Sequence, residues 1–315
     1  MAENKIQFQK GISIPMFIRQ FGTEEQCEHA LKKVKWPLGY VCEECGHKSF
    51  CYIKSRRIYQ CNRCKHQTTV TRNTVFHSTN LPLTSWFLAM YLISQCKNGI
   101  SGLELMKHLG VSYKTAWRIR HKLMQVMVER DMQKKLMGLI EVDDAYLGGQ
   151  KSDGKRGRGS ENKQPIVAAV KITSDNHPIY VKLSPVASFT KNTIEKWSSA
   201  HLDSNCYVVT DGLGCFNAFS NTTRKHIPIP MKKDPKTGKK PYFKWVNTIL
   251  GNVKSSITGT YRASKDDYAA RYLAEFQYWI NRRFDLETIL PRLIYASVHT
   301  PPLSRGLLRK AANCT

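Results

Sequence analysis

The spacing of apolar residues divides the chain into a helical first part and a mixed second part. Apolar positions recur every three or four residues in residues 12–38 and 83–127, which predicts helices there. From Gly138 the period changes, and four short segments rich in valine and isoleucine predict strands. These segments are Gly138–Gly149, Pro165–Thr173, Pro178–Ala187 and Cys206–Gly212. A helix is predicted between the last two strands, at residues 190–201, and helical spacing returns in residues 244–285.

Capping residues and prolines mark where several of these elements begin and end. Thr23 is predicted to cap a helix that Pro37 ends. Ser264 and Asp267 have the spacing of a capping box before the last predicted helix. Residues 226–244 are rich in proline and lysine and are predicted to form a loop.

Four of the ten cysteines have the spacing of a zinc site. Cys42 and Cys45 form one CxxC pair and Cys61 and Cys64 form another, with an alternating, strand-like segment between them. Two such turns place four thiolates at the corners of a tetrahedron, which predicts a structural zinc ribbon. A redox CxxC is the alternative, although redox motifs rarely come as matched pairs. Once four thiolates close the site, no ligand role is expected for Cys27, His47, Cys51 or His66.

Residues 101–127 have the pattern of a helix-turn-helix. A first helix is predicted at residues 101–108, a turn at 109–111, and a second helix capped by Ser112. The second helix of this motif enters the major groove of DNA, whereas an ordinary helical hairpin is the alternative reading. The predicted DNA contacts are Tyr113, Lys114, Thr115, Arg118 and Arg120, while Trp117 and Leu123 are predicted to be core residues.

Charge narrows the class of partner. The chain of 315 residues carries 49 Lys+Arg against 24 Asp+Glu, a net charge of +25. A charge of this size attracts polyanions, and it favours nucleic acid over a membrane surface because no basic amphipathic helix with an aromatic face is visible. No apolar run reaches the roughly 20 residues that span a bilayer, and no signal-peptide pattern is seen, so we expect a cytoplasmic, nucleoid-associated protein.

The order strand, strand, strand, helix, strand, followed by helices, is that of an RNase H-like domain. In that architecture an acid on the first strand lies beside an acid at the end of the fourth, and a later helix adds a third ligand. Asp143 and Asp211 occupy the first two positions. Such a cluster can hold two Mg²⁺ ions about 3.5–4 Å apart. Asp144 is predicted to face away from Asp143 because strand side chains alternate, whereas Glu141 shares the face of Asp143 and either supports the site or is solvated at an edge.

A glycine-rich basic segment follows the first strand. Its Lys155, Arg156 and Arg158 are predicted to neutralise DNA phosphates beside the acids. A solvated, flexible connection is the alternative reading of the same segment.

Four segments together resemble one protein family. They are the paired CxxC motifs, "VSYKTAWRIRHKL", "IEVDDAYLGGQKSDGKRGRGSENKQPIVAAV", and "VVTDG" followed by "WVNTILGNVKSSITGTYR" and "YLAEFQYWINRRFD". In these segments, which cover nearly all residues from about 25 to 285, the chain resembles the zinc-ribbon-bearing ISXO2-like group of bacterial insertion-sequence transposases of the DDE superfamily.

The resemblance implies an α+β multidomain protein with an N-terminal zinc ribbon, a helix-turn-helix segment and a C-terminal RNase H-like catalytic domain. The implied activity is that of a DNA transposase, which binds terminal inverted repeats and catalyses metal-dependent strand cleavage and strand transfer. The implied cofactors are Mg²⁺ or Mn²⁺ and Zn²⁺. The implied partners are transposon ends and target DNA, held by a homodimer or larger synaptic complex.

Family members carry Glu or Asn at the third metal position, with Lys seven residues later. Asn247 and Lys254 match that spacing, so the resemblance implies four catalytic residues with Asp143 and Asp211. Asn252 and Glu275 are weaker candidates for the third position. Because asparagine lacks the charge of an acid, a decayed or domesticated DNA-binding protein is the alternative function. A zinc-ribbon transcription regulator and a nuclease or resolvase of the same fold are further alternatives.

The predicted domains follow from these motifs. A helical segment covers residues 1–40, the zinc ribbon 41–78, the helix-turn-helix region 79–135, the catalytic domain 136–300, and a basic tail 301–315.

Overall fold

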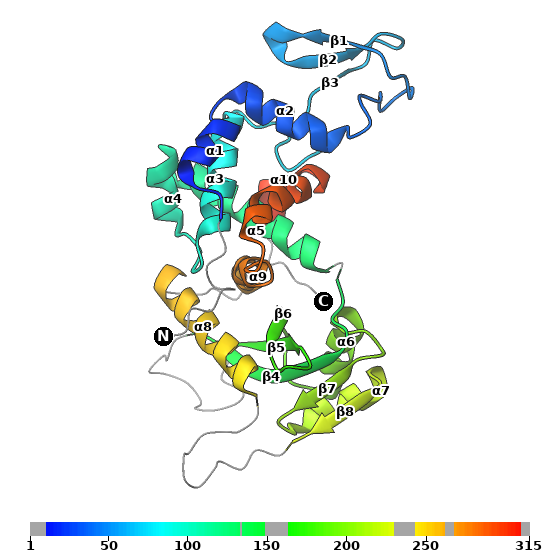
Figure 1. Cartoon of the computed structure of the whole chain (residues 1–315), viewed down its shortest axis with the longest axis vertical. Coiled ribbons are helices and arrows are strands. Elements are labelled where there is room, and N and C mark those ends of the chain that lie inside the picture. The colour runs from blue at the N-terminus through cyan, green and yellow to red at the C-terminus, as the bar shows by residue number, and fades with distance from the viewer. Residues whose placement is uncertain (1–10, 133, 149–162, 230–242, 262–267, 310–315) are drawn as a thin grey trace. The chain divides into compact units, whose positions relative to one another are not determined.

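A computed structural model describes residues 11–132, 134–148, 163–229, 243–261 and 268–309 of the chain. The chain divides into two compact units (Figure 1). The first comprises Met1–Gln95, Gly102–Val126 and Phe284–Leu308, and the second Cys96–Ser101, Met127–Arg283 and Arg309–Thr315. None of the described helices is long and apolar enough to cross a membrane.

The first unit joins a small sheet to a group of helices. The sheet has the order β1 (Phe50–Ile53), β2 (Ile58–Cys61), β3 (Gln67–Thr68), and both pairings are antiparallel. The helices are α1 (Ile14–Phe21), α2 (Glu24–Lys35), α3 (Leu83–Gln95), α4 (Gly102–Leu109), most of α5 (Tyr113–Met132), α10 (Ile289–His299) and α11 (Arg305–Arg309). The structure confirms the predicted Thr23 cap, which forms a capping box with Gln26.

Helix α2 holds the small sheet through a buried acid and an aromatic cluster. Glu28 on α2 accepts hydrogen bonds from the hydroxyl groups of Tyr52 (2.9 Å) and Tyr59 (3.1 Å). The ring of Tyr59 also packs against Trp36 and Tyr40, with centroid distances of 5.1 and 6.4 Å. A sheet of this size buries little apolar surface of its own, so contacts with α2 and a bound metal ion would supply much of its stability.

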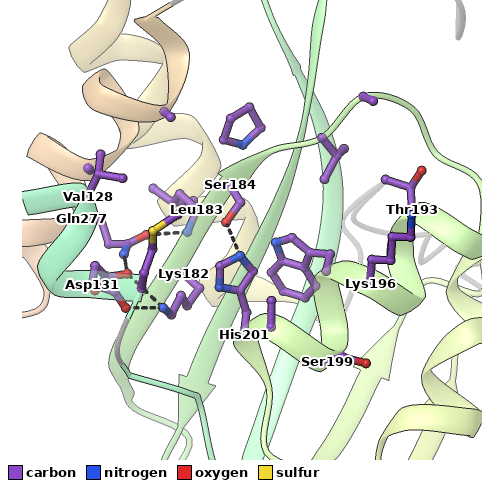
Figure 2. A pocket seen from close by; sticks show the side chains of 18 of the residues that line it. Val128, Asp131, Lys182, Leu183, Ser184, Thr193, Lys196, Ser199, His201 and Gln277 are labelled. Atoms are coloured by element: carbon purple, nitrogen blue, oxygen red, sulfur yellow. Dashed lines mark hydrogen bonds and ion pairs between the residues drawn. The ribbon is translucent and has the colours of Figure 1, made fainter. Parts of the chain in front are cut away.

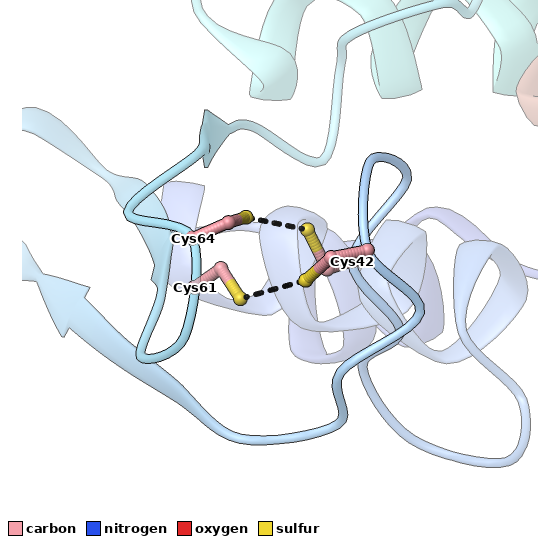
Figure 3. Close-up of side chains that lie close together, drawn as sticks. Cys42, Cys61 and Cys64 are labelled. Carbon is pink, nitrogen blue, oxygen red and sulfur yellow. Dashed lines mark hydrogen bonds between the residues drawn. The ribbon is translucent and has the colours of Figure 1, made fainter.

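Two tight turns bring four cysteine sulfurs together at one end of this sheet (Figure 3). The Sγ atoms of Cys42 and Cys64 are 3.5 Å apart, and those of Cys45 and Cys61 are 3.6 Å apart. Tetrahedral zinc with Zn–S bonds of about 2.3 Å separates its sulfurs by about 3.8 Å, so the set has the size of a zinc site. Burial raises the pKa of the Cys42 thiol, but backbone N–H groups outweigh this effect and bring the pKa to about 6, which favours the zinc-binding thiolate.

The residue after each CxxC pair closes its turn. Gly46 and Lys65 have left-handed backbones, with φ of 69° and 62°. Their N–H groups donate to the carbonyls of Cys42 (3.0 Å) and Cys61 (3.1 Å). The two turns therefore have the same construction, which explains why the sulfurs meet as two matched pairs.

Helix α10 completes the helical core of the first unit. It packs against α2 and α3. The Oγ of its buried Ser297 lies 3.7 Å from the sulfur of Met90, and the Ser297 carbonyl accepts the N–H of Val75 at 3.2 Å. Residues 284–308 thus group with the N-terminal helices, whereas the predicted boundary at residue 300 places most of them with the catalytic domain. Apolar periodicity predicts a helix but does not reveal which core it joins.

The second unit is built on a five-stranded sheet of order β6-β5-β4-β7-β8. Strands β4 (Leu139–Leu147), β5 (Gln164–Ile172) and β6 (Pro178–Pro185) are antiparallel neighbours. Strands β7 (Tyr207–Thr210) and β8 (Lys225–Pro228) run parallel to β4. With helix α6 (Lys191–His201) between β6 and β7, this is an RNase H-like topology, and the predicted fold class is confirmed.

Strand β8 corrects the prediction of a loop from residue 226. Pro228 and the prolines that follow disfavour a central strand, which is why the pattern predicts a loop. β8 is the edge of the sheet, where a proline without an N–H removes no bond between strands.

Helices cover both faces of the sheet. Helices α8 (Lys244–Tyr261) and α9 (Ala269–Ile280) pack on the face that carries Ala145 and Leu147. Helix α6, with η3 (Gly214–Ala218) and α7 (Phe219–Thr222), packs on the face that carries Ile140 and Val142. Because side chains alternate along a strand, Glu141 and Asp143 belong to the face that α8 covers.

Helix α9 also protects the edge strand β6. The side-chain amides of Gln277 and Asn281, one helical turn apart, accept the backbone N–H groups of Leu183 (2.5 Å) and Val181 (2.7 Å). Asn281 returns a bond to the Val181 carbonyl at 2.9 Å. The amides occupy positions where another strand would pair, which protects the sheet from edge-to-edge association.

A buried ion pair fastens the last turn of α5 to β6 (Figure 2). The Nζ of Lys182, whose side chain is 1% exposed, lies 3.1 Å from Asp131 Oδ2, and Gln277 also donates to this carboxylate. The pair borders a cavity of about 1010 Å³ between α5, β6, α6 and α9. There Ser184 Oγ lies 3.4 Å from His201 Nε2, and burial lowers the pKa of His201 to about 4, so this imidazole is neutral near pH 7.

Asp131→Ala leaves a buried ammonium without its counter-ion, and we expect it to lower the free energy of unfolding by about 3–5 kcal/mol. Arg292→Ala breaks an exposed pair with Asp285 (3.0 Å) and serves as the matched control, with an expected cost below about 1 kcal/mol. Urea unfolding followed by tryptophan fluorescence measures both. Equal effects of the two substitutions would contradict this account of the buried pair.

Cys45→Ser removes one of four zinc thiolates, and we expect the variant to retain much less than the roughly one zinc ion per chain of the unaltered protein. Cys51→Ser changes an exposed cysteine on β1 and is expected to keep the full zinc content. Elemental analysis of the purified proteins gives the metal content. An unaltered protein without zinc, or the same zinc content in both variants, would rule out the site.

Candidate active site

Three carboxylates converge where β7 ends beside the middle of β4. Asp143, Asp144 and Asp211 each offer one oxygen, and these oxygens lie within 4.8 Å of one another. The parallel pairing of Val142 with Thr210 brings this about, because Asp143 and Asp211 are the next residues of the two segments. All three acids are half-buried, so a ligand can still reach them. The structure therefore places together the two aspartates that the sequence pairs.

The prediction that Asp144 faces away from this cluster is wrong. Strand alternation does place its Cβ on the opposite face from that of Asp143. However, β7 ends at Thr210, so among the described residues no strand pairs with β4 on that side at Asp144. Its carboxylate lies in the same cluster as those of Asp143 and Asp211. The N–H of Asp144 also donates to Asp143 Oδ1 at 2.9 Å. The signal in the sequence for this third carboxylate is the adjacency of the two acids.

The turn after β7 fixes Asp211. Its Oδ1 accepts the N–H of Leu213 at 3.1 Å. Gly212 has a φ of 84°, a conformation that glycine adopts without steric cost. Buried Thr210 supports the turn, since its Oγ1 accepts the N–H of Gly212 at 3.3 Å and lies 2.8 Å from His226 Nε2. These bonds hold the Asp211 carboxylate at the strand end, beside β4.

Asn247 and Lys254 lie on one exposed flank of α8. They are two helical turns apart, so their side chains leave the helix in nearly the same direction. The Nδ2 of Asn247 donates to the Phe243 carbonyl at 2.8 Å, which leaves the amide oxygen as the atom for a cation. Gly251 lies between them on this flank, with open space where a Cβ would be, so a ligand can approach the backbone closely.

The weaker candidates for the third position lie elsewhere. Glu275 is 4% exposed and accepts bonds from the Tyr261 hydroxyl and the Ile100 N–H (3.4 Å). Among the described residues it is not part of the acid cluster, and it ties the segment before α4 to α9. Asn252, five residues after Asn247, points to another side of α8.

Helices α4 and α5 form the predicted helix pair in the first unit. The Oγ of Ser112 accepts the N–H of Thr115 at 3.3 Å, so the predicted cap of the second helix is confirmed. Tyr113, Lys114 and Arg118 are exposed, and Thr115 is half-buried. These side chains at the start of α5 are available to a ligand.

Arg120 does not lie on this exposed face, and the prediction that it contacts DNA is wrong. It is 4% exposed. Position 120 follows buried Ala116 by four residues and precedes buried Leu123 by three, so the helical period places it on the inner face. Leu123 is a core residue, as predicted, and Trp117 is half-buried and stacks on His121 with ring centroids 4.1 Å apart.

Some predicted residues lie outside the described part of the chain. They are the phosphate contacts Lys155, Arg156 and Arg158 and the capping residues Ser264 and Asp267. The positions of these five residues therefore stay predictions from the sequence.

Comparison with known proteins gives two family matches. Residues 135–281 match the ISXO2-like transposase domain, and residues 22–67 match the transposase zinc-ribbon domain. The first match contains the acid cluster and α8, and the second contains all four clustered cysteines.

A similar sequence and two solved structures accompany these matches. The sequence is an uncharacterized protein in transposable element ISH50 of Halobacterium salinarum, 27% identical over 233 residues, which are 67% of this chain and 76% of the relative. The Mos1 mariner paired-end complex with Mn is 11% identical, with a TM-score of 0.25 over 64% of this chain and 75% of that one. The Mos1 transposase paired-end complex with left transposon end is also 11% identical, with a TM-score of 0.22 over 68% and 79%. The strand order β6-β5-β4-β7-β8 defines the RNase H-like fold of the second unit.

The two family matches together span more than half of the chain. Each match coincides with a cluster that the structure assembles, one of four thiols and one of three carboxylates. The chain belongs to the zinc-ribbon-bearing family of ISXO2-like transposases.

Proposed function

We propose that this chain is an insertion-sequence DNA transposase that cuts strands at the ends of its element and joins them to target DNA. The observation that carries the proposal is the convergence of Asp143, Asp144 and Asp211 within a transposase domain. Clustered carboxylates of this kind suit a site for hard divalent cations, which prefer oxygen ligands.

The reaction is an in-line phosphoryl transfer. Mg²⁺ or Mn²⁺, when bound among the carboxylates, would supply positive charge that favours both attack by an oxygen nucleophile and departure of the leaving oxygen. Asp143 on β4 and Asp211 directly after β7 would hold the cation. Asn247 would add a neutral amide oxygen, which binds less strongly than a carboxylate. Lys254, on the same flank of α8, positions a phosphate. Water first attacks a phosphorus at the end of the element and breaks its P–O3′ bond, which frees a 3′-OH. This hydroxyl then attacks a phosphorus of the target strand and displaces the 3′-hydroxyl of the neighbouring target nucleotide.

DNA recognition falls to the first unit. The exposed start of α5 presents Tyr113, Lys114 and Arg118, with Thr115 beside them, as the groove-reading surface of the helix-turn-helix. The net charge of +25 adds long-range attraction to the phosphate backbone. Joining two ends of an element requires that both be held at once, which implies a dimer or larger synaptic complex.

Asp143→Ala and Asp211→Ala each remove a cation ligand, and we expect each to slow strand cleavage roughly a thousandfold, the equivalent of about 4 kcal/mol. Asn247→Ala is expected to raise the Mg²⁺ requirement and to slow cleavage less, because it removes a neutral ligand. Cleavage and strand transfer are measured on duplexes taken from the DNA that flanks the gene.

Asp175→Ala changes an exposed aspartate of the β5–β6 turn and is the control, expected to match the unaltered protein. Full activity in Asp143→Ala or Asp211→Ala would exclude this site. Full activity in Asn247→Ala alone would show that a residue other than Asn247 is the third ligand. A clean, metal-loaded protein that binds these duplexes without cutting them would favour a DNA-binding protein that has lost catalysis.

Arg118→Ala and Arg120→Ala separate DNA contact from folding. Loss of exposed Arg118 is expected to weaken DNA binding and to reduce the slope of log affinity against log salt by about 1, with little change in thermal stability. Loss of buried Arg120 is expected to lower the melting temperature instead. Fluorescence anisotropy at several salt concentrations and calorimetry measure the two effects. Unchanged DNA affinity in Arg118→Ala would contradict this assignment of the exposed face.

A further inference from the structure

Glu141 is a buried acid close to the candidate active site. It lies two residues before Asp143 on β4, and its exposed fraction is 8%. A carboxylate is rarely buried this far unless polar groups bond it. Burial raises the pKa of Glu141, and the backbone N–H groups of Val246 and Trp245 act in the opposite direction. The acid is therefore neither solvated at an edge nor part of the carboxylate cluster found among the described residues.

The partners of Glu141 belong to the first turn of α8. The Val246 N–H donates to Glu141 Oε2 at 3.2 Å. A helix leaves its first N–H groups without acceptors, and a polar side chain just before the helix usually caps them. Here that residue is Phe243, whose carbonyl accepts the N–H of Asn247 at 3.1 Å but whose ring cannot accept a bond. The carboxylate of Glu141 takes the place of the missing cap from another element.

The backbone before α8 makes this external cap more important. Phe243 has a φ of 64°, a left-handed conformation that is uncommon for a bulky residue. The helix therefore begins from a strained residue whose side chain cannot cap it. A bond from the sheet to the first turn offsets both features.

The same bond connects the strand that carries the first acid to the helix that carries the third ligand. Asp143 lies two residues further along β4 and on the same face, so its Cα is about 6.6 Å from that of Glu141. Asn247 directly follows Val246 and is exposed, and its side chain is bonded to the backbone of the same turn, through Nδ2 to the Phe243 carbonyl. Its place depends on the backbone of the first turn, which Glu141 holds.

We infer that Glu141 is a positioning residue, which fixes the first turn of α8 to β4 and so keeps Asn247 within reach of a cation bound at Asp143. The inference rests on the proposed function, in which Asn247 is the third ligand. Glu141 acts as an acceptor of backbone N–H groups, a role that a neutral side-chain amide can also fill.

Two substitutions test this role. Glu141→Gln keeps an acceptor oxygen, whereas Glu141→Leu removes it at similar size. Hydrogen exchange at the Val246 and Trp245 amides shows whether they are bonded to residue 141. The Mn²⁺ concentration that gives half-maximal cleavage of a flanking-DNA duplex measures how readily the active site binds the cation. We expect Glu141→Leu to lose amide protection and to need about 10–100 times more Mn²⁺, and Glu141→Gln to stay close to the unaltered protein in both measurements.

Glu275→Leu is the matched control, because it removes another buried acid of the same unit, one that bonds the Ile100 N–H. It is expected to leave the Mn²⁺ requirement unchanged. An unchanged requirement in Glu141→Leu, or an equal rise in Glu275→Leu, would overturn the inference. An equal loss in Glu141→Gln would also overturn it, since the negative charge would then be essential.

Failure of the inference can be told apart from failure of the proposed function. If the unaltered protein cleaves no DNA with either metal, the proposed function fails. The hydrogen-exchange measurement still decides whether Glu141 fixes the first turn of α8. An unprotected Val246 amide in the unaltered protein would by itself overturn this role of Glu141.

Discussion

Repulsion among three carboxylates is the constraint on which the catalytic unit depends. At separations up to 4.8 Å and an effective dielectric constant of about 20, each pair of charges repels by roughly 3 kcal/mol or more. A fold keeps such a cluster when a divalent cation compensates it and when the backbone around it is rigid. Here rigidity comes from the central place of β4, which is hydrogen-bonded to β5 on one side and to β7 on the other. The shortness of β7 leaves the space beyond Thr210 in which the acids meet.

The same need for a rigid backbone applies to helix α8, which covers one face of the sheet. Its apolar face, with Val246, Leu250 and Val253, packs into the core, while its exposed flank carries Asn247 and Lys254. Core packing fixes the helix as a whole, but its first turn starts at Phe243, which has a left-handed backbone and a side chain that cannot cap the helix. A polar bond from β4 supplies what apolar packing cannot, namely a fixed direction for the backbone N–H groups at that end. In the first unit the cysteine cluster plays a comparable part, because its small sheet has too little core to be stable alone.

Much of this arrangement follows from the sequence, and the exceptions have physical reasons. Local rules suffice for the CxxC turns, the Thr23 and Ser112 caps and the first four strands of the sheet, because each depends on residues near in sequence. Asp144 was not predictable, since strand alternation says nothing about where the neighbouring strand ends. The charge of Arg120 alone predicts a DNA contact, whereas the helical period places this residue on the buried face of α5. Strand β8 and the partners of α10 depend on contacts far along the chain, which periodicity does not carry.

The most direct test is to locate a divalent cation in crystals of the protein soaked in Mn²⁺, by anomalous scattering. The account predicts a peak about 2.2 Å from carboxylate oxygens of both Asp143 and Asp211, in the space between β4 and the end of β7. It would be contradicted if that space stayed empty at millimolar Mn²⁺, or if the two carboxylates pointed into separate regions and bound no common ion.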